Sequence, residues 1–149
     1  MEGKLQDKYP RQRLLFFVAQ DIDDGIVSAV KQTIRDLSRE NTWLLAAPVF
    51  MDNQDEAQTR DGDLPDRTVG GVLEILGAAG GRLPRDLDAA TFADVDRLVQ
   101  AIRLLSVELS LEVEFELDGA YVGAIDEGEF DRSLAEGLLG EWRRHLEGV

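Results

Sequence analysis

Apolar positions in the first third of the chain predict a strand, a helix and a second strand. The run at residues 14–19, LLFFVA, is short and rich in aromatic residues, which favours a central strand. Acidic residues that can cap a helix follow it. Apolar side chains then recur at helical spacing: Ile26, Val30, Ile34 and Leu37. Residues 43–50 predict the next strand, and because Pro48 cannot donate a ladder hydrogen bond, we expect this strand at a sheet edge or ending in a bulge.

Residues 51–66 form a polar stretch after this strand. It contains six acidic side chains against Arg60 alone, and a loop of this length in a compact domain is usually functional or mobile. Repeated aspartates could form a calcium-binding EF-hand loop, but Ala57 stands where the turn glycine is required and Asp63 where the final glutamate is required. We therefore predict an acidic loop without a calcium site. The polar residues 1–12 are expected to be flexible.

Two helices are predicted in the middle of the chain. The first covers residues 68–79 and ends at Gly80 and Gly81, although internal glycines weaken it. Its inward positions are apolar: Val69, Val72, Leu73 and Leu76. The second begins at Thr91, which forms a pattern like a capping box with Asp94. Its apolar stripe is longer: Phe92, Val95, Leu98, Val99, Ile102 and Leu105.

The clearest local signal lies in residues 104–131, which contain nine acidic side chains and no lysine or arginine. Two β-prone runs flank Asp118 and Gly119, a pair that suits a type I′ turn because both central residues of that turn need positive φ. This hairpin pairs Leu117 with Ala120, and the same register places Phe115 opposite Val122 and Glu114 opposite Gly123. Glu112, Glu114 and Glu116 then share one face of the sheet, and the apolar residues share the other.

This row of glutamates has two interpretations that the sequence leaves open. Like charges along a strand repel one another, so the row does not serve strand stability. A solvated outer face is the simpler interpretation, since charged rows also hinder edge-to-edge pairing of sheets. The alternative is a docking surface for a basic partner, with Tyr121 as an aromatic anchor among the carboxylates.

The chain closes with one more predicted helix, which Asp131 can cap. Its apolar face is formed by Leu134, Leu138, Trp142 and Leu146. Together these elements predict a single α+β domain over residues 1–149. We expect the order β-α-β-α-α-β-β-α and a mostly antiparallel sheet with its helices mainly on one face.

Composition narrows the classes of partner. The 149 residues carry 30 acidic and 16 basic side chains, a formal net charge of −14. Such a charge opposes binding to nucleic acid and to anionic membranes, and it favours cationic protein surfaces. Cysteine is absent, which excludes disulfides and thiol catalysis. No apolar run reaches the length of a membrane span and the N-terminus lacks a signal-peptide pattern, so we expect a cytoplasmic protein.

Catalytic signals are sparse, and we expect neither enzymatic activity nor a cofactor. His145 is the one histidine, and the nearest serine in sequence, Ser133, lies more than about a dozen ångströms away along the same predicted helix, at about 1.5 Å per residue. The paired glycines lack the lysine and serine or threonine that follow in a phosphate-binding loop. An all-carboxylate active site is the remaining enzymatic alternative, because the chain is so acidic.

The ending FELDGAYVGAIDEGEFDRSLAEGLLGEWRRHL, residues 115–146, resembles the hairpin-then-helix endings of small acidic bacterial immunity proteins of polymorphic toxin systems. The resemblance covers about a fifth of the chain. It implies a cytoplasmic inhibitor that binds a cognate toxin, often a basic nuclease, in a stoichiometric complex. It transfers no active-site residue. The pattern of charges alone suggests the partner-binding residues: Glu112, Glu114, Glu116, Asp118, Tyr121, Asp126 and Glu127.

A second class of binding protein also fits this composition. Chaperones of type III secretion are small, acidic and α+β, but this chain departs from their pattern by beginning with a strand instead of an amphipathic helix. A chaperone should expose apolar grooves for an unfolded segment, whereas an immunity protein should recognise a folded partner. An enzyme with a carboxylate-only site is the third possibility.

Overall fold

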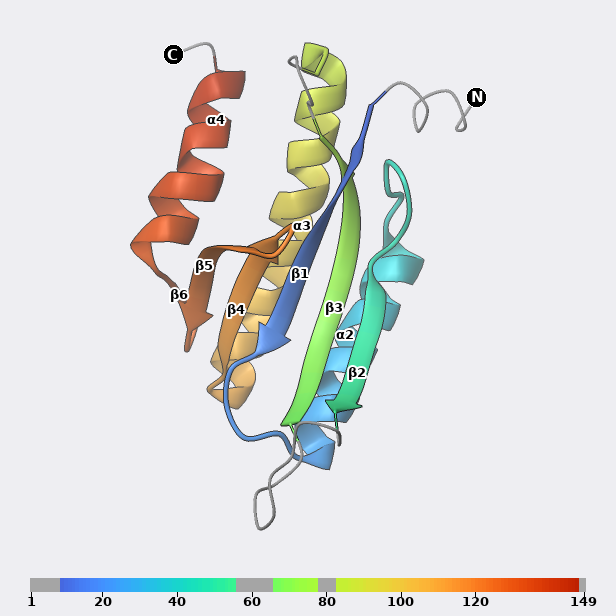
Figure 1. The fold of residues 1–149 in the computed structure, drawn as a ribbon, viewed down its shortest axis with the longest axis vertical. Helices are drawn as coiled ribbons and strands as arrows, with labels where there is room; N and C mark the ends of the chain where they lie inside the picture. Colours follow the sequence, from blue (N-terminus) through green and yellow to red (C-terminus); the bar gives the residue numbers. More distant parts are fainter. Residues whose placement is uncertain (1–8, 56–65, 78–82, 148–149) are drawn as a thin grey trace.

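The computed structural model describes residues 9–55, 66–77 and 83–147. Within these residues, six strands form one antiparallel sheet in the order β2-β3-β1-β4-β5-β6 (Figure 1). Helices α2 and α3 lie behind the sheet in Figure 1, and the C-terminal helix packs beside α3. The predicted α+β class, with an antiparallel sheet and its helices on one face, is confirmed.

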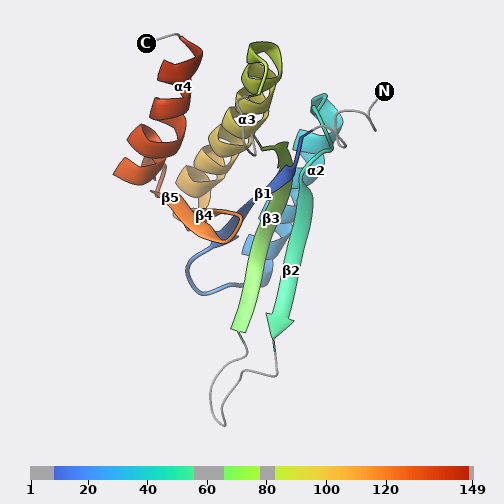
Figure 2. The ribbon, with the colours of Figure 1, turned by 45° about the horizontal axis from the view of Figure 1, so that its top comes forward.

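The first six elements have split β-α-β connectivity, as in ferredoxin-like folds. Strand β1 lies between β3 and β4 and pairs antiparallel with both. The two crossovers run through helices on the same face of the sheet (Figures 1 and 2). The elements are β1 (Arg11–Val18), α2 (Asp24–Glu40), β2 (Val49–Asp55), β3 (Asp66–Leu76), α3 (Arg85–Leu109) and β4 (Glu112–Leu117).

The predicted first strand and first helix are confirmed. The carboxylate of Asp23 accepts a hydrogen bond of 2.8 Å from the backbone N–H of Ile26, which caps the start of α2. The apolar stripe of α2 is buried against the sheet, as its spacing predicts. Strand β1 begins at Arg11, inside the segment 1–12 that was expected to be flexible; residues 1–8 of that segment lie outside the described residues.

The predicted edge position of the second strand is confirmed, but its bounds are wrong. Strand β2 begins at Val49, directly after Pro48, and the preceding residues 41–48 are not strand. It continues to Asp55, so residues 51–55 belong to the sheet and not to the predicted acidic loop. Residues 56–65 of that loop lie outside the described residues.

The helix predicted at residues 68–79 is wrong, because residues 68–76 belong to strand β3 (Asp66–Leu76); residues 78 and 79 lie outside the described residues. Burial alternates along it, with Val69, Leu73 and Ile75 packed toward the helices. A side chain at Gly70 would approach the carbonyl oxygen of Phe16 to 1.8 Å, so the close contact with β1 requires glycine. The apolar residues also fit a helical period, which is why the spacing misleads.

Helix α3 begins at Arg85, six positions before the predicted start. Thr91 therefore lies within the helix, where its hydroxyl donates to the carbonyl of Leu87 at 2.7 Å. Asp94 is buried and accepts a hydrogen bond of 2.9 Å from the backbone N–H of Leu44. The predicted capping box is wrong, and Asp94 instead joins α3 to the segment that precedes β2.

The predicted hairpin is confirmed as β4 and β5 (Ala120–Asp126), with φ of 51° at Asp118 and 87° at Gly119. Leu117 pairs with Ala120 and Glu116 with Tyr121, as predicted. Beyond these pairs the register shifts by one residue, so that Phe115 lies opposite Gly123. The cause is tertiary, because a side chain at Gly123 would lie 2.4 Å from Cβ of Leu134.

The chain ends in a short strand and a helix. Strand β6 (Glu129–Phe130) pairs with β5 and was not predicted. The predicted last helix consists of a π-helical segment, η2 (Ser133–Gly140), followed by α4 (Glu141–Leu146). Its predicted cap is present, since the carboxylate of Asp131 accepts a hydrogen bond of 2.8 Å from the N–H of Leu134. The i to i+5 winding turns Leu139 into the core together with Leu134.

Candidate docking face

The sheet has one face toward the helices and one face away from them, which we call the open face. No described helix covers it (Figure 1). Alternation along each strand decides which side chains it carries. It has an acidic half on β4, β5 and β6, formed by Glu112, Glu114, Glu116, Tyr121, Asp126 and Glu129. It has an apolar half on β1, β2 and β3, formed by Leu15, Phe17, Val49, Met51 and Val72.

The acidic half gathers carboxylates across three neighbouring strands. Glu112 pairs with Asp126, and Asp126 pairs with Glu129. Directly opposed like charges are unfavourable in a sheet. None of the five carboxylates in the acidic half forms an ion pair with another described residue. Glu129 was absent from the residues predicted to bind, because β6 was not recognised.

The position of β4 in the sheet argues against one part of the simpler interpretation, in which the glutamate row protects a sheet edge from pairing. Strand β4 is internal, hydrogen-bonded to β1 on one side and to β5 on the other. Protection of an exposed edge, which is one established use of strand charges, therefore does not apply to Glu112, Glu114 and Glu116. Glu112 is exposed, and the other two are half-buried.

Tyr121 lies beside Glu116 on the acidic half and is 53% exposed. Its hydroxyl donates a hydrogen bond of 2.5 Å to the carboxylate of Asp131, which also caps the last helix. This hydrogen bond, together with partial burial and the nearby charges of Asp131, Glu114 and Glu112, raises the pKa of Tyr121 to about 12. The hydroxyl end of the ring is thus tethered to Asp131.

Asp118 and Glu127, which were also predicted to bind, occupy turns. The carboxylate of Asp118 accepts a hydrogen bond of 2.9 Å from the backbone N–H of Arg13, and the N–H of Asp118 donates to the carbonyl of Arg13 at 3.0 Å. Glu127 has a φ of 49° in the turn between β5 and β6, and its N–H donates to the carbonyl of Leu111 at 3.1 Å. Both residues are exposed, and the contacts of Asp118 stabilise the turn against β1.

The apolar half adjoins the acidic half along β1. Leu15 lies between Val72 on β3 and Glu116 on β4, and Phe17 lies beside Glu114. Val49 is 65% exposed. A hollow of about 440 Å³ lies over the β2 end of this half, lined by Ala46, Ala47, Val49, Phe50, Met51, Asn53 and Val72 with the charged residues Arg13 and Glu74. Sequence reasoning missed this surface because β3 was assigned as a helix; the alternation of β3 residues was the available signal.

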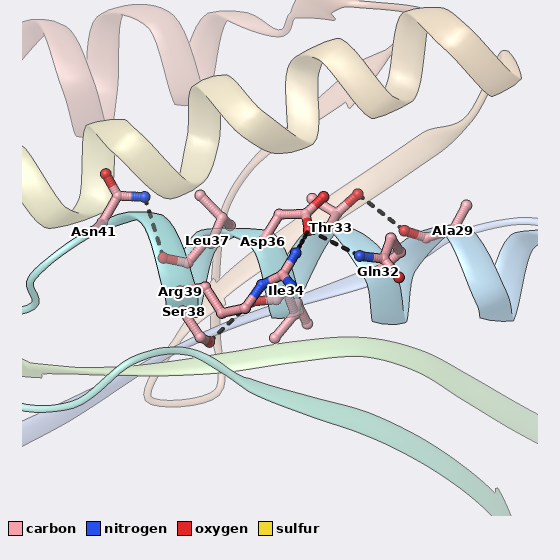
Figure 3. A network of polar contacts seen from close by, with 9 residues as sticks. All are labelled: Ala29, Gln32, Thr33, Ile34, Asp36, Leu37, Ser38, Arg39 and Asn41. Atoms are coloured by element: carbon pink, nitrogen blue, oxygen red, sulfur yellow. Dashed lines mark hydrogen bonds and ion pairs between the residues drawn. The ribbon is translucent and has the colours of Figure 1, made fainter.

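Other polar groups of the described residues make local contacts. The network on the outer side of α2 is an example: Asp36 accepts hydrogen bonds from Gln32 at 2.8 Å and Arg39 at 2.7 Å, all within one helix (Figure 3). His145 lies 3.9 Å from the carboxylate of Asp88, which also accepts a hydrogen bond of 2.8 Å from the indole of Trp142. Among the described residues, no three acidic or histidine side chains converge on a position for a metal ion.

Comparisons of the chain with protein-family models, with curated proteins and with solved structures find no match. In the described part of the chain, no helix has both the length and the apolar character needed to cross a membrane. A split β-α-β fold supports many unrelated activities, so function has to be argued from the surface itself. The open face, with its adjoining acidic and apolar halves, is the most distinctive surface of the described residues.

Proposed function

We propose that this chain is a binding protein that captures a cationic protein on its open face. The observation that carries the proposal is the acidic half, where five carboxylates on three adjacent strands have no cationic partner among the described residues. Lysine or arginine side chains of a partner would relieve this repulsion on binding. The net charge of −14 would steer such a partner toward the chain.

The apolar half complements this electrostatic contribution. Protein interfaces derive much of their affinity from a desolvated apolar centre, and charged groups around it contribute more to association rate and specificity. Leu15 and Phe17 are half-buried and lie next to the glutamates, so a partner that contacts both halves would bury apolar area and pair charges in the same interface. Tyr121, fixed by Asp131, supplies an aromatic contact within the acidic half.

Within this class, the function that we propose is immunity: inhibition of a cognate basic toxin by one-to-one binding in the cytoplasm. The resemblance of residues 115–146 to the endings of acidic immunity proteins supports this function. The same residues supply β5, β6, the last helix and Asp131, which caps that helix and accepts the hydrogen bond of Tyr121. Inhibition by occlusion needs no catalytic group on this chain.

Parallel affinity capture tests the proposal. The chain and its variant Glu112→Lys/Glu114→Lys/Glu116→Lys are immobilised and exposed to host lysate at low and at moderate salt. The chain should retain one basic protein at equal stoichiometry, more of it at low salt, and co-expression should abolish the toxicity of that protein. Retention of the same protein by both baits would contradict the proposed acidic site, and persistent toxicity of the bound protein would contradict immunity.

A chaperone for secretion is the second candidate, and the apolar half with its hollow favours it. The captured protein distinguishes the two functions. Limited proteolysis of the complex should leave a folded partner intact if the chain is an immunity protein. Digestion of the partner down to one short protected segment would instead support the chaperone.

A further inference from the structure

The sheet has a free edge that the proposed acidic site does not use. Strands β2 and β6 are the outer strands, and β6 has only two residues, whereas β2 has seven. Strand β2 pairs with β3 on one side only. In Figures 1 and 2, no described strand lies beyond it on the other side. Alternate N–H and C=O groups along β2 therefore point outward without a partner from the described residues.

Long free edges are normally protected in monomeric proteins by lysine, proline, a bulge or a covering element. The register of β2 with β3 runs from Val49 to Asp55 without a bulge. Pro48 lies before the strand, and the strand itself, VFMDNQD, contains neither lysine nor proline; its two charged residues, Asp52 and Asp55, are both acidic. The edge thus retains the features of a template for an added strand.

The side chains around β2 indicate which types of side chain an added strand would have on each face of the sheet. Val49 and Met51 flank the edge on the open face, next to the hollow of about 440 Å³. Residues of an added strand alternate between the two faces, so every second side chain would lie over this apolar surface. On the helix side the edge carries Asp52, which is paired with Arg67 at 3.0 Å and also feels the charge of Lys31.

Charge decides against a second copy of the chain as the occupant. A copy would bring its own net charge of −14 and a second Asp52 to the same edge. A segment with lysine or arginine at alternate positions would instead be attracted by this charge. We propose that the β2 edge binds an extended segment of a partner by strand addition, with apolar side chains over Val49 and Met51 alternating with basic ones.

This site does not depend on the acidic half. Strand addition uses the backbone of β2, which lies three strands away from β4 in the sheet order. It is compatible with a folded partner that carries an extended arm and with an unfolded one. Loss of binding at the acidic half therefore leaves the proposal for β2 intact, and the reverse also holds.

Hydrogen exchange of the full chain with two designed peptides tests the proposal. The first peptide alternates lysine and valine over nine residues with blocked ends, and the second replaces each valine by proline, which keeps the charge and removes the ability to extend a sheet. The first should slow exchange of alternate amides between Val49 and Asp55 by about tenfold or more, and the second should not. Met51→Lys should abolish the protection, whereas Glu141→Gln, an exposed charge change on the C-terminal helix, should preserve it.

Five outcomes would overturn the proposal. Equal responses to both peptides, or protection confined to β4–β6, would show attraction by charge alone. Protection of β2 without peptide that rises with protein concentration would show pairing with a second copy. Protection without peptide at every concentration would show that the chain covers this edge itself. An unchanged response of Met51→Lys would exclude the apolar contacts.

Discussion

The two halves of the open face differ in how they relate to the rest of the fold. The apolar half lies over β1, β2 and β3, where Gly70 brings the backbones of β1 and β3 into close contact, and its side chains other than the exposed Val49 are half-buried. The acidic half lies over the β4–β5 hairpin, and its carboxylates have no ionic partners among the described residues. One half is therefore constrained by packing, whereas the charges of the other half have no ionic partner within the described fold.

The largest expected effect concerns the backbone beneath the apolar half. Gly70→Ala would place Cβ 1.8 Å from the carbonyl oxygen of Phe16, so β1 and β3 would have to separate. We expect the free energy of unfolding to fall by about 3 kcal/mol, measured by urea denaturation. Gly137→Ala is the matched control, because a Cβ at this exposed helical position would meet no other part of the chain within 4 Å, and it should be neutral or stabilising by up to about 1 kcal/mol. Equal stability of both variants would contradict the close strand contact.

Substitutions in the acidic half should lower the affinity for the partner without lowering the stability of the fold. Replacing Glu112, Glu114 and Glu116 by Lys should weaken the complex with a captured basic partner by about 10²-fold, mainly through slower association. The unfolding midpoint should not fall, since these side chains make no ion pair with a described residue. Surface-based kinetics at two salt concentrations and thermal unfolding measure the two quantities. Unchanged affinity would identify the glutamate row as a solvated face.

The loss of affinity caused by substitutions in the apolar half should not depend on salt. Leu15→Ser/Val49→Ser should weaken the same complex by about tenfold, through faster dissociation, because buried apolar area is lost. The loss should be similar at low and moderate salt, since ions screen charges and not apolar contacts. Titration calorimetry at both salt concentrations measures it. A loss that disappeared at higher salt would show that the apolar half does not contact the partner.

The smallest effect concerns Tyr121, whose pKa is raised to about 12 by its hydrogen bond to Asp131. A raised folded-state pKa contributes stability that is complete below the ordinary value of about 10 and is lost as pH rises toward 12. In a Tyr9→Phe background, tyrosinate absorbance should titrate near pH 12, and Asp131→Asn should move the midpoint toward 10. A parent midpoint near pH 10 would contradict the hydrogen bond.

The partner of Tyr121 in this hydrogen bond, Asp131, has a lowered pKa. Burial alone would raise it, but the hydrogen bonds from Tyr121 and from the backbone N–H of Leu134 outweigh burial. A lowered folded-state pKa contributes stability above the ordinary value near 3.8, and this contribution is lost as pH falls through the folded-state pKa. The contact between Tyr121 and Asp131 is therefore expected to persist throughout the neutral range.

Short sequence patterns predicted the parts of the fold that depend only on residues adjacent in sequence. Asp118-Gly119 predicted the hairpin turn because positive φ is a property of those residues. The acidic residues after the first strand predicted the start of α2, which Asp23 caps, because a cap needs only its neighbouring turn. The register beyond Tyr121 could not be predicted, since the shift accommodates the contact between Gly123 and Leu134. Strand β3 was missed because its apolar residues fit both periods and its glycines meet β1 only in the folded protein.

Only the part of the candidate site that depends on local pattern could be predicted from the sequence. Charge and alternation placed Glu112, Glu114 and Glu116 on one face with Tyr121, and the structure places them there. Glu129 lies beside these residues only because β6 pairs with β5, and the apolar half forms only because β1 pairs with β3. Both pairings depend on the topology of the sheet. The residues of an apolar surface spread over three strands have no common sequence signal.

Carboxyl footprinting tests the central claim most directly. The chain, alone and in complex with the captured basic protein, is treated with a carbodiimide and an amine, and mass spectrometry measures the modified fraction of each acidic residue. We expect modification of Glu112, Glu114, Glu116, Asp126 and Glu129 to fall strongly in the complex. The exposed carboxylates of Glu136 and Glu141, on the C-terminal helix, should be modified equally in both samples. Unchanged modification of the first group, or protection of the second alone, would place the partner elsewhere and contradict the proposed docking face.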